Sequence, residues 1–143
     1  MSPSPTFAPR EDVGYYSDQS RSDARIDNAL AAAEYEQRAV SSHHAASLVA
    51  VHTVLEEARF SPEVFVGDHA SASNRNHVEF AERAAIADLA VRLAVAENTI
   101  RAYEHQVVTM IARTPISWER FRYGDLSAAN ARTISELAAS LPD

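Results

Sequence analysis

The sequence predicts an all-α protein, and composition and hydrophobic spacing are the observations that predict it. Only 3 of the 143 residues are glycine, whereas alanine is very common. Alanine is the strongest helix former, and few glycines leave little material for the tight turns of β-hairpins. Apolar residues recur at helical spacing, and no segment alternates in the manner of a half-buried strand. We therefore expect a long N-terminal helix followed by a bundle of shorter helices.

The first 22 residues differ from the rest of the chain. They are rich in Ser, Pro, Asp and Arg and show no apolar periodicity, which predicts a disordered arm over residues 1–22. Residues 23–143 form the predicted helical domain. The N-terminus lacks the apolar core of a signal peptide, and no apolar run approaches the roughly 20 residues of a membrane span. We therefore expect a cytoplasmic protein without a membrane partner.

A heptad-like stripe predicts one long helix over residues 23–60. Residues of this stripe are spaced three and four apart. A helix of this length favours a helical hairpin or a coiled-coil contact, so we expect the stripe to pack on later helices or on a second chain. Its members are Ile26, Leu30, Ala33, Gln37, Val40, His44, Ser47, Val51, Val54 and Ala58.

The shorter helices are predicted from their apolar stripes and end signals. A hydroxyl followed by proline starts a helix at Ser61-Pro62 and again at Thr114-Pro115. Gly124 is expected to end one helix in a left-handed conformation, and Asp125 or Ser127 to cap the next. The expected segments are a short turn ending at Val66, a polar loop over 67–76, and helices over 77–93, 97–113, 115–123 and 127–139.

Charge and residue types exclude most catalytic chemistries. The absence of cysteine removes disulfides, thiol catalysis and cysteine zinc sites. The net charge of −7 argues against strong non-specific binding to nucleic acid, which requires neutralised phosphates. No glycine-rich phosphate loop, hydrolase elbow or convergent carboxylate pair is recognisable. We therefore assign no catalytic residue, cofactor or small-molecule substrate.

The segment from Ala90 to Ile100 has helix-turn-helix spacing. Small and apolar residues at Ala90, Leu93, Val95 and Ile100 would let two helices cross closely over a short turn. The turn position carries Ala94 instead of the usual glycine, although a left-handed conformation there is costly for alanine. A plain antiparallel helical hairpin needs the same apolar positions, so both interpretations stay open. The exposed face would offer Glu97, Asn98, Arg101 and His105.

Arginines alternate with aromatic residues between Trp118 and Tyr123. Arg120 and Arg122 could contact phosphates while the aromatic rings stack on bases. The alternative is a short amphipathic helix that buries Trp118 and Phe121 and leaves the arginines in solvent. The residues predicted to bind nucleic acid are Asn98, Arg101, His105, Arg120 and Arg122.

No metal site is assigned from the sequence. His69, Asn74 and His77 have the residue types of an HNH nuclease motif in order, but their spacing leaves no room for the hairpin and helix that hold its metal. His52 and Glu56 lie one helical turn apart and could supply two ligands. Two ligands without a third are weak evidence for a site.

The C-terminal region, residues 77–143, resembles a known family. Its pieces are Ala90 to Leu93, Ala96 to Thr99, Thr114-Pro115, Gly124 to Ser127, and Ala131 to Ile134. In this combination they resemble the domain of unknown function 222, which precedes HNH endonuclease domains in many actinobacterial proteins. The family has no settled activity, so the resemblance implies a helical accessory region and transfers no catalytic residue.

Three hypotheses follow from this resemblance and from the residues. The first is a non-catalytic accessory domain that docks weakly on DNA or on a nuclease domain. The second is a fragment of a metal-dependent HNH nuclease whose catalytic domain is missing, because the HNH motif is absent from this chain. The third is a structural protein that forms a homodimer through its long helix.

Overall fold

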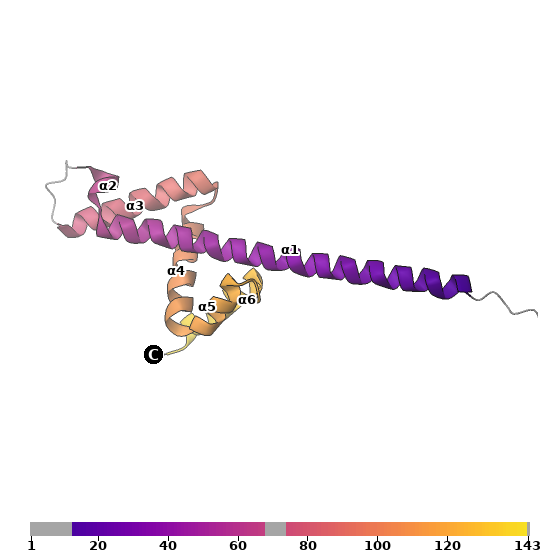
Figure 1. The fold of residues 1–143 in the computed structure, drawn as a ribbon. Coiled ribbons are helices and arrows are strands. Elements are labelled where there is room, and N and C mark those ends of the chain that lie inside the picture. Colours follow the sequence, from indigo (N-terminus) through magenta and orange to yellow (C-terminus); the bar gives the residue numbers. More distant parts are fainter. Residues whose placement is uncertain (1–12, 68–73, 143) are drawn as a thin grey trace, which may run out of the picture. The chain divides into compact units, whose positions relative to one another are not determined.

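The computed structural model describes residues 13–67 and 74–142, and within them every regular element is α-helical (Figure 1). This confirms the predicted all-α fold with a long N-terminal helix and shorter helices after it. The helices are α1 (Val13–Phe60), α2 (Glu63–Val66), α3 (Asn74–Leu93), α4 (Glu97–Arg113), α5 (Pro115–Arg122) and α6 (Ala128–Ser140).

Helix α1 begins earlier than expected. It starts at Val13 instead of near Asp23, so residues 13–22, which the sequence placed in the N-terminal arm, are helical. Helix propagation adds one backbone hydrogen bond per residue, so a helix can extend past the end of its apolar pattern. Residues 1–12, the rest of the predicted arm, lie outside the described residues.

The chain divides into two compact units between Glu36 and Gln37. In the first unit the described residues are helical, and every described side chain from Asp18 to Glu36 is exposed. Ile26 and Leu30 are among them, with more than half of each side chain open to solvent. The second unit, from Gln37 onward, contains the hydrophobic core.

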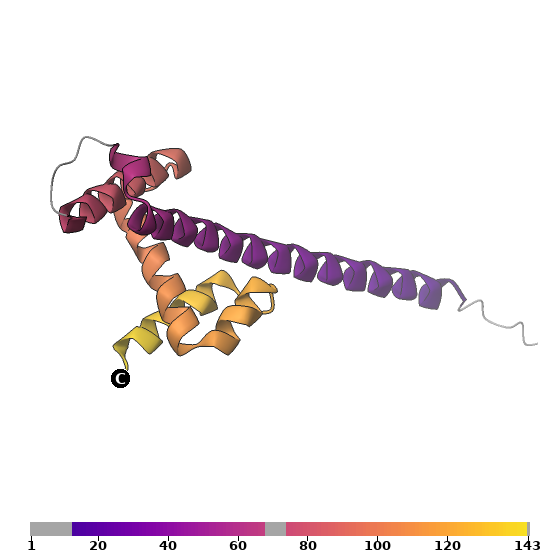
Figure 2. The same cartoon turned by 60° about the vertical axis from the view of Figure 1, so that its left-hand side comes forward.

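Two clusters of buried side chains form this core, and α4 contributes to both. Helix α4 contacts α3 near its start and α5 and α6 further along (Figures 1 and 2). The α3 cluster comprises Val51, Leu55, Ala58, Ala81, Ala85, Ile86, Leu89, Ala90 and Ile100. The α5 cluster comprises Ala45, Leu48, Val107, Met110, Trp118, Phe121 and Ala131.

The buried stripe on α1 differs from the predicted one. Val40 and Ser47 are exposed, whereas Leu48 and Leu55 are fully buried. The prediction continued the heptad spacing of the first unit into the second unit. There, packing against α3 to α6 buries residues that mostly lie one position later in the sequence than predicted. Val51 and Ala58 were placed correctly, and their burial is intramolecular. The buried positions are Ser41, Ala45, Leu48, Val51, Leu55 and Ala58.

The end of α5 and the start of α6 follow the predicted signals. Gly124 has φ +81°, and the Asp125 N–H donates to the Arg120 carbonyl over 2.8 Å, which completes a Schellman ending. Ser127, not Asp125, caps α6, because its Oγ accepts from the Asn130 N–H at 3.2 Å. Asp125 pairs instead with Arg38 of α1 at 3.0 Å.

The sequence predicts no membrane-spanning segment. None of the helices in the described ranges is both long and apolar enough to cross a membrane.

Candidate functional site

The turn between α3 and α4 has the expected left-handed residue. Ala94 has φ +53° and is the one non-glycine residue with positive φ among the described residues. The Ala94 N–H donates to the Val91 carbonyl at 3.3 Å, and the Val95 N–H donates to the Ala90 carbonyl at 3.0 Å. These two bonds make a Schellman ending, so an alanine here occupies the position that glycine usually takes.

The packing of this turn matches most of the predicted apolar positions. Ala90 and Ile100 are buried in the α3 cluster, and Val95 packs against it. Leu93 departs from the prediction because 43% of its side chain is exposed. A small residue at the end of α3 and a branched one in the first turn of α4 let the helices cross closely, as a helix-turn-helix unit requires.

The N-terminal half of α4 exposes the three residues predicted to face nucleic acid. Asn98, Arg101 and His105 are all exposed. Asn98 and His105 line a groove of about 580 Å³, to which α6 contributes Arg132. Arg101 pairs with Glu97 at 3.6 Å, so part of its charge is already compensated. The face therefore offers hydrogen-bond donors with little net positive charge.

Helix α5 supports the amphipathic interpretation of its aromatic residues. Trp118 is 6% exposed and Phe121 is fully buried in the α5 cluster, so neither ring is available to stack on a base. Arg120 and Arg122 are exposed, and Arg122 pairs with Glu119 at 3.2 Å. Neither arginine lines the groove beside Asn98, so the five predicted residues do not share one pocket.

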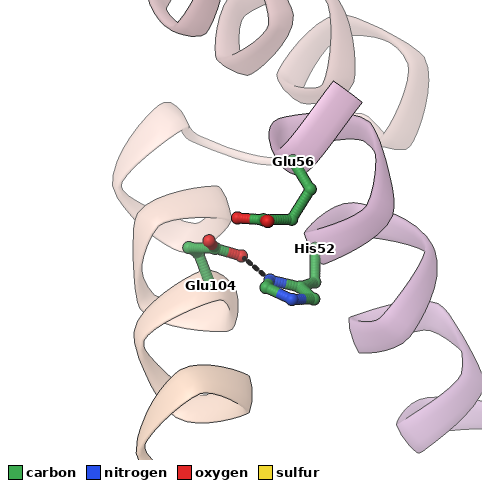
Figure 3. Close-up of side chains that lie close together, drawn as sticks. All are labelled: His52, Glu56 and Glu104. Carbon is green, nitrogen blue, oxygen red and sulfur yellow. Dashed lines mark hydrogen bonds and ion pairs between the residues drawn. The ribbon is translucent and has the colours of Figure 1, made fainter. Parts of the chain in front are cut away.

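A second group of polar residues lies between α1 and α4 (Figure 3). His52 and Glu56 project from α1 toward Glu104 of α4, and one donor atom from each lies within 4.8 Å of the others. His52 Nδ1 is 2.9 Å from Glu104 Oε2. The Glu104 side chain is only 12% exposed. Tertiary packing thus adds a third donor to the pair recognised in the sequence.

Arg59 neutralises part of this group. Its Nη1 donates to Glu56 and to Glu104, each at 2.7 Å, and its Nη2 donates to Glu82 of α3 at 3.0 Å. Partial burial lowers the pKa of Arg59, but hydrogen bonds to Glu82, Glu104 and Glu56 outweigh it and raise that pKa above its ordinary value. Three carboxylates surround one guanidinium, so negative charge remains whether or not His52 carries a proton.

Sequence reasoning missed Glu104 because its partner His52 lies 52 residues away. Glu104 follows the half-buried Tyr103 on α4, and no local motif marks it as a partner of α1. Of the three residues that resemble an HNH motif, Asn74 and His77 lie on α3, and His69 lies outside the described residues.

Comparisons with protein-family models, curated proteins and solved structures find no match for this chain. The resemblance to the domain of unknown function 222 therefore stays a prediction from the sequence.

Proposed function

We propose that this chain is a non-catalytic helical docking module whose exposed α4 face contacts duplex DNA. The observation that carries the proposal is the α3–α4 unit, in which a tight left-handed turn at Ala94 is followed by a helix that exposes Asn98, Arg101 and His105. Helix-turn-helix proteins present their second helix to the major groove in this way. Asn98 and Arg101 have the side-chain types that read adenine and guanine edges.

The charge of the chain sets the strength of the proposed contact. With a net charge of −7 and Arg101 paired to Glu97, few phosphates can be neutralised. Binding should therefore be weak and should fall steeply as salt is raised. In the HNH-associated family that the sequence resembles, the partner would be a nuclease domain that supplies the chemistry.

Fluorescence anisotropy with a labelled duplex at low salt tests the proposal. Arg101→Ala and the double change Arg120→Ala with Arg122→Ala should each weaken binding. Arg21→Ala is the matched control, since Arg21 is an exposed arginine on α1 that pairs with an acid, Asp18, at 3.7 Å. If the Arg101 and Arg21 variants bind the duplex with equal affinity, α4 is not part of the DNA interface.

A homodimer is the second candidate, and the exposure of Ile26 and Leu30 on α1 favours it. These side chains are 55% and 58% exposed, and a helix-helix contact would cover them. Sedimentation of Ile26→Glu with Leu30→Glu against the unsubstituted chain tests it. Val51, which the predicted stripe also includes, is buried within one chain and therefore reports on folding.

The nuclease-fragment hypothesis has its own test. A plasmid-nicking assay with Mg²⁺, Mn²⁺ or Zn²⁺ should detect no cleavage by this chain alone. Cleavage that is abolished by His77→Ala would favour the fragment hypothesis over a docking module.

A further inference from the structure

We propose that His52, Glu56 and Glu104 bind one divalent transition-metal ion, for which Zn²⁺ is the probe. The proposal does not rest on the proposed DNA contact, because none of the three ligands is among its residues, although Arg101 and His105 line the same groove as Glu56 and Glu104. It rests on three donor side chains from two helices whose ligand atoms lie within 4.8 Å of one another.

The geometry fits an ion of this size. Zinc binds nitrogen and oxygen ligands at roughly 2.0–2.2 Å, so ligand atoms around it lie about 3–4 Å apart. His52 Nδ1 and Glu104 Oε2 are already 2.9 Å apart, and Glu56 lies one turn from His52 on the same helix. Small side-chain rotations would therefore bring the three donors to bonding distance and leave a fourth position for water.

The donor types select the class of ion. One imidazole nitrogen with two carboxylates suits zinc and other borderline transition metals, whereas Mg²⁺ and Ca²⁺ prefer ligand sets made of oxygen alone. Solvent reaches these carboxylates through a groove of about 600 Å³, which Glu56, Arg59 and Glu104 line. An ion could enter by this route without unfolding the bundle.

Arg59 competes with the ion for the same carboxylates. Its Nη1 bonds to Glu56 and Glu104 would be lost when the ion binds, while its Nη2 bond to Glu82 could persist. Removing this guanidinium should therefore strengthen ion binding, because three carboxylates would then lack a counter-charge. Loss of the guanidinium alone would also attract a cation to the three carboxylates, so the His52 variant decides whether an ion is ligated here.

Competition between the intact chain and a chromophoric zinc indicator tests the proposal. We expect one zinc ion per chain, and we expect His52→Ala and Glu104→Gln each to weaken binding by at least roughly tenfold. His43→Ala is the matched control, because His43 is an exposed histidine on the same helix, and it should bind as the unsubstituted chain does. Arg59→Gln should bind more tightly and gain more thermal stability on zinc addition.

Each outcome decides the proposal. Circular dichroism shows which variants fold, and His52→Ala is decisive because it retains every charge of the ion-pair network around Arg59. Absence of zinc binding, or equal binding by His52→Ala and His43→Ala, would overturn the site. Zinc binding by Arg59→Gln that is no tighter than that of the unsubstituted chain would also overturn it.

Discussion

Gly124 lies where α5 ends against the backbone of α1, and Gly124→Ala should destabilise the protein. A Cβ at this position would lie 2.4 Å from the Arg38 carbonyl oxygen and 3.0 Å from the Arg38 carbonyl carbon and Cα. The nearest atoms belong to a helix backbone, which cannot move aside as a flexible side chain would. The backbone of Gly124 is also left-handed, at φ +81°.

Three effects determine the size of the loss. A left-handed alanine costs about 1–2 kcal/mol, and overpacking typically costs about 1–3 kcal/mol. The smaller conformational entropy of alanine in the unfolded chain returns about 0.4–1 kcal/mol. We therefore expect a net loss of roughly 2–4 kcal/mol, which is a large part of the 5–15 kcal/mol that stabilises a typical domain.

The reciprocal change, Ala94→Gly, is a matched control. Ala94 occupies the same position in the other Schellman ending, at φ +53°, and it is exposed. Its replacement by glycine removes the backbone strain without relieving any close contact, so we expect a gain of about 0.5–1 kcal/mol. Urea unfolding followed by circular dichroism measures both changes. If Gly124→Ala lowers the free energy of unfolding by no more than Ala94→Gly raises it, α5 does not approach the Arg38 backbone this closely in solution.

Three further changes probe the bundle by the same unfolding measurement. Arg113→Met removes hydrogen bonds of 2.8 and 2.7 Å to the carbonyls of Ala138 and Leu141 at the end of α6, and should lower the free energy of unfolding by about 1 kcal/mol. An unchanged free energy would mean that these hydrogen bonds do not stabilise the end of α6. Val51→Asp puts a charge into the α3 cluster and should cost more than about 3 kcal/mol, whereas Ser47→Asp on the exposed side of α1 should change stability by less than about 0.5 kcal/mol. If Ser47→Asp destabilised the protein as much as Val51→Asp, the predicted stripe would be correct. Ser127→Ala removes the cap of α6 and should cost about 1 kcal/mol, and an unchanged midpoint would refute the capping role.

The sequence determined the features that depend on neighbours along the chain. Helix α4 was predicted with the bounds observed, Glu97–Arg113, and the break at Thr114-Pro115 and the glycine ending at Gly124 were also predicted. Caps, proline positions and left-handed endings follow from backbone geometry within one or two turns. The left-handed conformation at Ala94 was recognised for the same reason. Local sequence located the helix breaks, although neither Ser61 nor Thr114 makes the expected capping bond. Pro62 is the residue that precedes α2, and the Thr114 hydroxyl donates to the Met110 carbonyl at 3.4 Å.

Tertiary structure decided which face of each helix is buried and which distant residues meet. The stripe on α1 shifted because Leu48 and Leu55 pack against helices that lie far along the chain, and the same packing buries Trp118 and Phe121 of α5. Glu104 lies beside His52 only because α4 packs beside α1, so no spacing in the sequence identifies the pair. Burial and ligand sets depend on contacts across the fold, and periodicity along one helix does not encode the position of its neighbours.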